Sequence, residues 1–129
     1  MKENKYSRDN TPKQGDIVWI NFDPSKGKEI KKKRPALILS TDEYNKATGM
    51  IVVCPITSTE RAEFIEIDEI QKVSGFINPL QIKTFDYKIE ARKVEYIEYL
   101  NDRDMADVIQ IVDQIFNFGR MINIFDDMK

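Results

Sequence analysis

Short apolar stretches separated by turn residues occupy most of the chain up to about residue 94. Between positions 16 and 22, Val18, Ile20 and Phe22 alternate with a second set of residues, and this period of two in β-branched and aromatic residues predicts a β-strand. Further strands are expected at 35–40, 50–56, 63–68 and 75–84, with 87–94 pairing with the last of them. The strand at 35–40 is continuously apolar and should be buried on both faces, and a single helical turn is expected within 41–48.

The periodicity changes after residue 100. Asn101 is a favourable N-cap with Asp104 three residues on, and Gly119 stands where a C-terminal cap belongs. Between them, apolar residues recur every three or four positions: Met105, Val108, Ile109, Val112, Ile115 and Phe116. The pattern predicts a mainly β protein with one C-terminal helix (α+β), a small antiparallel barrel with the helix packed on it. Residues 1–12 are expected to be a flexible arm, and 13–129 a single domain.

The amino-acid composition excludes several kinds of catalytic and metal-binding site. The 129 residues include no His and one Cys, which excludes imidazole acid–base catalysis, His-ligated metals and Cys-rich metal sites. Carboxylates, Lys, Arg, hydroxyls and backbone dipoles remain. No apolar run is long enough to span a bilayer, and the polar N-terminus lacks the apolar stretch of a secretory signal, so we expect a cytoplasmic protein with no membrane association.

Charge is unevenly distributed around a net charge of −2. The segment 23–34 has six basic and two acidic residues, a net charge of +4, whereas 95–129 has eight acidic and three basic residues, a net charge of −5. The basic residues of the first segment are Lys26, Lys28, Lys31, Lys32, Lys33 and Arg34. A loop between two strands can present them to phosphates, or they can simply be solvated. Arg34 differs from the lysines because Pro35 restrains its backbone.

Two other segments contain candidate binding groups. Thr57, Ser58 and Thr59 follow a buried strand, where their hydroxyls could bind a phosphoryl oxygen or satisfy free backbone groups. Gln81 and Lys83 alternate along an expected strand and, taken alone, describe an ordinary exposed face. Cys54 lies inside an apolar strand and is interpreted as an inert core residue.

The order of these motifs along the chain is more specific for a protein family than any single motif. Gly15 opens the first strand, Pro24, Gly27 and Glu29 follow in the loop, and Arg34-Pro35 precedes the apolar run. In this order and spacing, and with Pro55-Ile56-Thr57 further on, the chain resembles the MazF/PemK (Kid) toxin family, most strongly over residues 12–60. It departs from the family pattern at Ile30 and Leu80.

The resemblance implies an SH3-like barrel that works as a homodimer and is bound by a cognate, MazE-like antitoxin. It implies a toxin of a type II toxin–antitoxin system: an endoribonuclease, without metal or other cofactor, that cuts single-stranded RNA (mostly mRNA) at short sequences and leaves a 2′,3′-cyclic phosphate and a 5′-hydroxyl. The family's catalytic Arg and Thr fall on Arg34 and Thr57, and its loop Glu on Glu29. The expected RNA-binding residues are Lys26, Lys28, Lys31, Lys32, Lys33, Ser58, Gln81 and Lys83.

The residues themselves agree with such a reaction. Cleavage by the 2′-hydroxyl of the RNA needs a base, an acid and stabilisation of charge on the phosphoryl oxygens. Arg34 suits the third task through its planar fork, while its high pKa makes a guanidinium a poor proton shuttle, and Glu29 is the nearest conceivable base. Two alternatives stay open at this point: a non-catalytic toxin on a similar barrel, such as a CcdB-like gyrase inhibitor, and a plain RNA- or protein-binding module.

Overall fold

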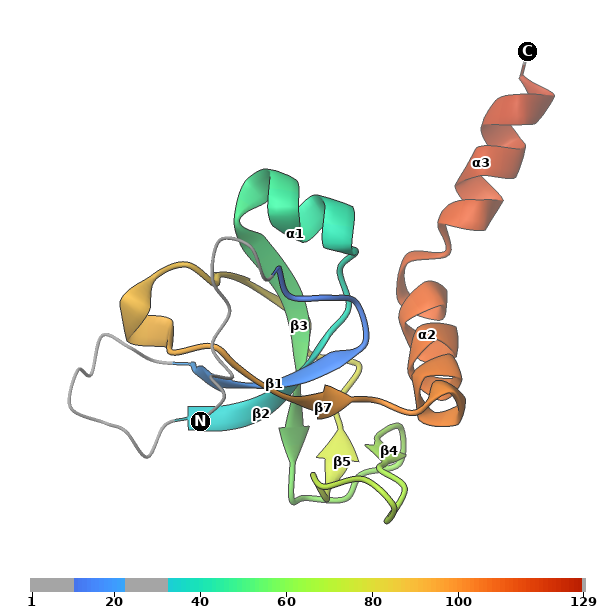
Figure 1. Ribbon diagram of the computed structural model, residues 1–129. Helices are drawn as coiled ribbons and strands as arrows, with labels where there is room; N and C mark the ends of the chain where they lie inside the picture. Colours follow the sequence, from blue (N-terminus) through green and yellow to red (C-terminus); the bar gives the residue numbers. More distant parts are fainter. Residues whose placement is uncertain (1–10, 23–32, 129) are drawn as a thin grey trace.

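The computed structural model describes residues 11–22 and 33–128 (Figure 1). Its strands are β1 (Asp16–Asn21), β2 (Lys33–Ile38), β3 (Met50–Thr57), β4 (Ile65–Glu66), β5 (Phe76–Ile77), β6 (Lys83–Asp86) and β7 (Glu95–Tyr99). Its helices are α1 (Asp42–Thr48), the 3-10 helix η3 (Glu90–Arg92), α2 (Asp102–Phe116) and α3 (Phe118–Asp127).

All strand pairs are antiparallel, in the order β4-β5-β3-β2-β1-β7, and β6 also pairs with β3. The long strand β3 organises the sheet, since β2 lies along one edge and β6 followed by β5 lies along the other. The sheet curls into a half-barrel with α2 at its side (Figure 1). The expected mainly β architecture with a C-terminal helix is therefore confirmed.

The two faces of the sheet bury two different clusters. Ile17, Leu37 and Cys54 pack with Met105 and Val108 of α2 on one face. The opposite face buries the alternate residues of the same strands, including Ile20, Ala36, Val53 and Phe85. Because Ala36, Leu37 and Ile38 are all fully buried, the prediction that this strand is covered on both faces is confirmed.

In the middle of the chain one strand prediction is too long and another is wrong. Only Ile65–Glu66 of the expected strand at 63–68 is paired, and 87–94 turns away from the sheet into η3 instead of pairing. The apolar ends of that segment, Tyr87 and Val94, are buried, which explains the misleading pattern. The strand that does pair with β1 is β7, just beyond it.

The C-terminal prediction is half right. Asn101 caps α2 as expected, accepting a hydrogen bond on Oδ1 from the Asp104 N–H at 2.9 Å. The helix stops at Asn117 and not at Gly119, because Asn117 adopts the left-handed conformation (φ 46°), which Asn tolerates better than most residues. Gly119 instead lies inside α3, which extends away from the sheet (Figure 1). In the described part of the chain, none of the helices combines the length and the apolar character needed to cross a bilayer.

Candidate active site

The register of β2 against β3 brings Arg34 and Thr57 together. Ala36 pairs with Pro55 and Ile38 with Val53, so paired residue numbers keep a constant sum. Carried two residues beyond Ala36, this register sets Arg34 opposite Thr57. Directly opposed residues of an antiparallel pair share one face of the sheet, with Cβ atoms about 4.5–5.5 Å apart.

Lys83 belongs to the same face. It pairs with Val53 on the other edge of β3, and Val53 and Thr57 are separated by two full periods of the strand. Arg34 and Lys83 are both exposed, whereas Thr57 is half-buried. A guanidinium, an ammonium and a hydroxyl therefore lie on one side of the sheet, contributed by three neighbouring strands.

Gln81 reaches this region through Asn78. Between β5 and β6 the chain leaves the ladder, and the Asn78 N–H donates to the Pro55 carbonyl at 2.9 Å. The Asn78 side-chain amide in turn donates to Gln81 Oε1 at 3.4 Å. Since Pro55 has no N–H for a ladder bond, the break in β-pairing falls where β3 cannot donate, and Gln81 is held near the end of β3.

The Thr57 hydroxyl is positioned by its own neighbours. The Thr59 N–H donates to Thr57 Oγ1 at 3.2 Å, which uses a lone pair and leaves the hydroxyl proton to be donated elsewhere. Gly75 packs against the backbone here: it has φ +126°, and a Cβ on it would lie 2.6 Å from the Thr57 carbonyl oxygen. Ser58, the next residue, is exposed.

Lys33 does not join this group. It is the neighbour of Arg34 in β2, so its side chain leaves the opposite face, where it pairs across the sheet with Asn21. Its Nζ lies 2.9 Å from Glu95 Oε1 in β7, an ion pair with both side chains partly buried. The structure thus places Lys33 on the face opposite Arg34 and Lys83.

Arg92 is a residue that sequence reasoning missed. Its Nη1 donates to the carbonyls of Asn21 and Phe22 at 3.0 Å each, and its guanidinium carbon lies 4.2 Å from the centroid of the Phe85 ring. These contacts fix the end of β1, on the way to the basic segment. No local pattern signals this role, because the contact spans 70 residues of sequence.

Some predicted residues are outside the described part of the chain. They are Glu29, Lys26, Lys28, Lys31 and Lys32.

Cys54 takes no part in the candidate site. It is fully buried, and burial raises the pKa of its thiol to about 12, so the reactive thiolate is not formed at neutral pH. The inert core role predicted for it is confirmed.

The side chains on this face of the sheet are of types that can bind an anion. Arg34, Lys83 and Thr57 are hydrogen-bond donors, and charged donors bind phosphate oxygens strongly. Within the residues that the structure describes, no group of three or more Cys, Asp or Glu is arranged to hold a metal ion.

Comparison with known proteins gives consistent matches. A family model described as PemK-like, MazF-like toxin of type II toxin-antitoxin system matches residues 13–116. The endoribonuclease toxin MazF of Escherichia coli (strain K12) is 41% identical over 56 residues, which are 43% of this chain and 50% of that protein. Endoribonuclease PemK of Escherichia coli is 29% identical over 102 residues, 74% of this chain and 75% of that protein. The chain therefore spans about half the length of the MazF relative and three quarters of PemK.

Solved structures agree on the fold. MazF (Form-I) from Deinococcus radiodurans superimposes with a TM-score of 0.71 at 28% identity, covering 83% of this chain and 97% of that chain. A MazE-MazF complex (Form-II) from the same organism gives a TM-score of 0.70 at 26% identity, covering 82% of this chain and 95% of that chain.

Proposed function

Since the chain belongs to the PemK-like, MazF-like family of type II toxins, we propose that it is the toxin of such a pair and acts as a sequence-specific endoribonuclease on single-stranded RNA, chiefly mRNA. The relatives MazF and PemK are named endoribonucleases, which supports this activity. The observation that carries the proposal is the register of β2 against β3, which puts Arg34 and Thr57 on one face of the sheet and, continued from the Ala36–Pro55 pair, sets them opposite each other.

The reaction is internal transesterification. The 2′-hydroxyl oxygen attacks the neighbouring phosphorus, the bond from phosphorus to the 5′-oxygen breaks, and the products are a 2′,3′-cyclic phosphate and a 5′-hydroxyl. Because the nucleophile is already tethered beside the phosphorus, no metal-bound hydroxide is needed. Arg34 holds two phosphoryl oxygens and offsets the charge that develops on them, and the Thr57 hydroxyl donates to the same group.

The proton transfers are assigned by elimination. A guanidinium has five N–H donors and no acceptor, so Arg34 serves as an electrostatic and orienting group. Glu29 is the proposed base for the 2′-hydroxyl proton. The leaving 5′-oxygen takes its proton from solvent or from a group on the basic segment.

RNA binding is assigned to the basic segment and to the exposed groups beside Thr57. We assign it to Lys26, Lys28, Lys31, Lys32, Ser58, Gln81 and Lys83. Lys33 is given a lesser part, because Glu95 holds its ammonium on the other face. If Arg34 and two or three lysines contact phosphates, log Kd should vary with log salt with a slope of about 2 to 3 for a single strand.

The remaining expectations follow from the family. We propose a cytoplasmic homodimer whose RNA groove crosses the subunit junction and whose cognate antitoxin competes for it. The solved complexes of MazE with MazF support an antitoxin partner. The +4 charge of the segment 23–34 gives an electrostatic reason for an acidic antitoxin tail.

The test uses a short RNA that contains one cleavage site, in EDTA, beside a twin that carries 2′-deoxy at the nucleotide 5′ to the cut. The natural strand should be cut to a cyclic phosphate, and the twin should stay whole. Cleavage of the twin, or activity restored only by Mg²⁺, would overturn the mechanism. No cleavage of any long RNA would overturn the activity and leave a non-catalytic toxin.

A further inference from the structure

Arg34 and Thr57 belong to a row of four side chains that crosses four strands. Thr57 pairs with Phe76 of β5, and Phe76 pairs with Glu66 of β4. Directly opposed residues of an antiparallel pair share one face of the sheet. With Arg34 added by the continued register of β2 and β3, the row runs Arg34, Thr57, Phe76, Glu66. At about 4.8 Å for each strand it is roughly 14 Å long.

The buried side chains of β4 and β5 support this assignment of faces. Ile56 and Ile77 pair with each other, and both belong to the hydrophobic cluster that α2 covers. Ile65 of β4 pairs with Ile77 and packs against the same cluster. Since side chains alternate along a strand, Phe76 and Glu66 leave the sheet on the opposite face.

The row is open to a ligand along its length. Arg34 and Glu66 are exposed, and Thr57 and Phe76 are half-buried. Phe76 belongs to neither of the two hydrophobic clusters that the described residues form, so its ring is not consumed by core packing. Within the described part of the chain no hydrogen bond or ion pair engages the Glu66 carboxylate, and both of its oxygens can accept from a ligand.

Gly75 allows Phe76 to lie this close to Thr57. At φ +126°, a Cβ on Gly75 would lie 2.6 Å from the Thr57 carbonyl oxygen, so a glycine is needed for β5 to approach β3 here. The Gly75 carbonyl also accepts from the Ile67 N–H at 2.9 Å, which attaches the end of β4 to the same point. The backbone on either side therefore fixes the position of Phe76 before any ligand binds.

The order of chemical groups along the row matches the order of the parts of a nucleotide. Arg34 and Thr57 are donors that suit a phosphate. The next residue, Phe76, has a ring of the kind on which proteins stack the bases of single-stranded RNA. Beyond it, a carboxylate can accept from the amino group of a base, as carboxylates do from cytosine. Glu66 would repel a phosphate, so its place at the far end of the row favours a base there.

We propose that Phe76 and Glu66 form a nucleobase subsite. Phe76 stacks on the base of a nucleotide that flanks the scissile phosphate, and Glu66 accepts a hydrogen bond from the exocyclic amino group of that base. This inference rests on the proposed endoribonuclease function and adds a determinant of the sequence that is cut. The subsite favours adenine, cytosine or guanine over uracil, which has no amino group.

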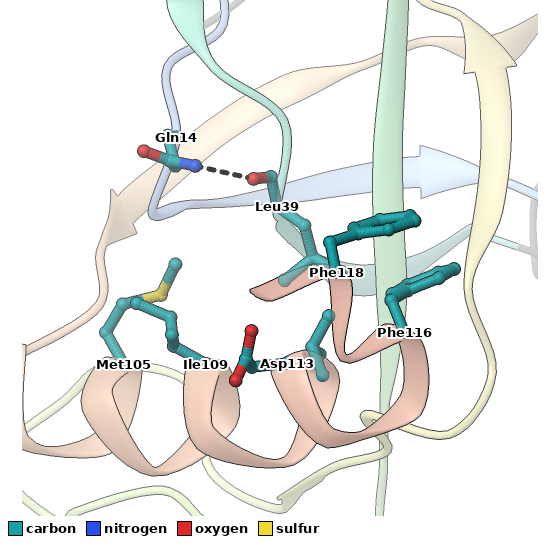
Figure 2. Close-up of a pocket in the computed structure, with 8 residues that line it drawn as sticks. Gln14, Leu39, Met105, Ile109, Asp113, Phe116 and Phe118 are labelled. Carbon is teal, nitrogen blue, oxygen red and sulfur yellow. Dashed lines mark hydrogen bonds between the residues drawn. The ribbon is translucent and has the colours of Figure 1, made fainter. Parts of the chain in front are cut away.

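The apolar groove at the elbow between α2 and α3 is not an alternative place for this base. Figure 2 shows the groove, of about 270 Å³, lined by Leu39, Met105 and the rings of Phe116 and Phe118. Met105 belongs to the cluster on the α2 side of the sheet, and Leu39 packs against it. A base in this groove would lie across the sheet from Arg34 and would not belong to a nucleotide whose phosphate Arg34 holds.

The first experiment measures binding by fluorescence anisotropy and does not depend on cleavage. The probes are 2′-O-methyl strands of about ten nucleotides, which lack the attacking hydroxyl: all adenine, all cytosine, all uracil and all abasic. Phe76→Leu should weaken binding of the adenine strand by roughly tenfold, since one stacked base is lost, and should leave binding of the abasic strand unchanged. Phe76→Trp, which keeps an aromatic face, should bind the adenine strand at least as tightly as the natural chain.

The abasic strand separates stacking from a merely structural role. Equal weakening of Phe76→Leu on the adenine and abasic strands would overturn the subsite, because Phe76 would then act through the fold. Normal binding of every strand by Phe76→Leu would also overturn it. Thermal unfolding checks that Phe76→Leu is folded. If it is not, Phe76→Trp decides the question, since a gain on the abasic strand as large as on the adenine strand would rule out stacking.

The second experiment tests Glu66 through base preference. The natural chain should bind the adenine and cytosine strands more tightly than the uracil strand. Glu66→Gln should narrow this difference roughly fivefold or more, because an amide can also donate to a uracil carbonyl. Glu69→Gln is the matched control, since it removes the same charge just beyond β4 and should keep the preference. An unchanged preference in Glu66→Gln, or an equal loss in both variants, would overturn the role of Glu66.

Failure of the subsite and failure of the nuclease activity are distinguished because no probe can be cut. Cleavage of RNA by the natural chain, with normal binding of every strand by Phe76→Leu, would overturn the subsite alone. Base-dependent binding through Phe76 without cleavage of any RNA would overturn the nuclease activity alone. Absence of binding to every strand by the natural chain would overturn the subsite whatever the activity.

Discussion

The sheet face that carries Arg34 and Thr57 differs from the C-terminal helix α3 in how its side chains are positioned. The first is polar and is positioned by the ladders of β2, β3 and β6, inside the segment that matches the family. The second is apolar, has no buried residue, and lies beyond that segment. The contrast indicates that the candidate site depends on a rigid register, whereas the exposed apolar residues of α3 lie where no ladder constrains them.

The sharpest test of the register is to replace adjacent residues of β2. Arg34→Ala should lower the cleavage rate by about 10²–10³, since a preorganised donor for the transition state is lost. Arg34→Lys should also fail, because a point charge cannot make the two parallel contacts of a guanidinium. Lys33→Gln, which removes a charge one residue away but on the opposite face, should cut RNA nearly normally. The measurement is single-turnover cleavage with saturating enzyme.

Two results would contradict the predictions for Arg34 and Lys33. Near-natural cleavage by Arg34→Ala would remove Arg34 from the reaction. Equal losses in Lys33→Gln and Arg34→Ala would mean that charge density, and not the face of the strand, determines activity. Thermal unfolding of each variant controls for loss of the fold.

Thr57 and Thr84 allow the same comparison between β3 and β6. Thr57→Ala should lower cleavage by roughly 10–100-fold because a donor to the phosphate is removed, while Thr57→Ser should keep most of the rate. Thr84→Ala is the matched control, since this exposed hydroxyl pairs with Val52 and lies on the opposite face of the sheet. A larger loss in Thr84→Ala than in Thr57→Ala would reverse the assignment.

Local pattern predicted the strands that form the core of the sheet. β1, β2 and β3 follow from period-two and continuous apolar runs, and the start of α2 follows from its cap Asn101. The single helical turn expected within 41–48 is the seven-residue helix α1. The motif order also indicated Arg34 and Thr57. The sheet adds a reason to propose that they act together, since the β2–β3 register, continued from the Ala36–Pro55 pair, sets residues 23 positions apart in sequence opposite each other.

What pattern could not predict depends on contacts between distant residues. The ion pair that holds Lys33 on the other face needs Glu95, and the anchoring of β1 needs Arg92, both far along the chain. The helix break was misplaced because Asn117, and not the glycine two residues later, adopts the left-handed conformation. The helix α3 was not predicted because Gly119 was taken as the end of the helix, although Met121, Ile122, Phe125 and Met128 beyond it recur at helical spacing.

Gly75 tests how tightly the sheet holds Thr57. Gly75→Ala should destabilise the protein by about 1–3 kcal/mol, because an Ala is strained at φ +126° and its Cβ would press on the Thr57 carbonyl oxygen. Urea unfolding measures this loss, and cleavage of the folded variant should fall as well. Gly119→Ala in α3 is the matched control. A Cβ at this position would have no neighbour within 4 Å, so the substitution should not destabilise the fold. Equal effects at the two glycines would remove the contrast between the two regions.

The two ends of α2 repeat the contrast on a smaller scale. The C-terminal end of α2 leads into the exposed helix α3. The N-terminal end is attached to the sheet by hydrogen bonds. The Asn101 N–H donates to Gln71 Oε1 at 2.8 Å, and the chain just after Gln71 is held by Glu98 of β7. The carboxylate of Glu98 accepts from the N–H groups of Lys72 and Val73 at 3.0 and 2.8 Å.

This attachment should weaken in acid. Burial alone would raise the pKa of the Glu98 carboxyl, but the hydrogen bonds from Lys72, Val73 and Gln71, together with the charge of Lys72, outweigh burial and lower the pKa below the ordinary 4.5. A lowered pKa in the folded state means that the ionised carboxylate stabilises the fold above about pH 4.5, and that this contribution is lost as the pH falls through the folded value. Glu98→Gln should therefore cost about 1 kcal/mol at pH 7, the net worth of a hydrogen bond to a charged group in a partly exposed site, and the difference from the natural chain should shrink towards pH 3. Urea titrations at both pH values measure it, with the exposed Glu69→Gln as control. A deficit of the same size at both pH values would show that Glu98 acts by packing and not through its charge.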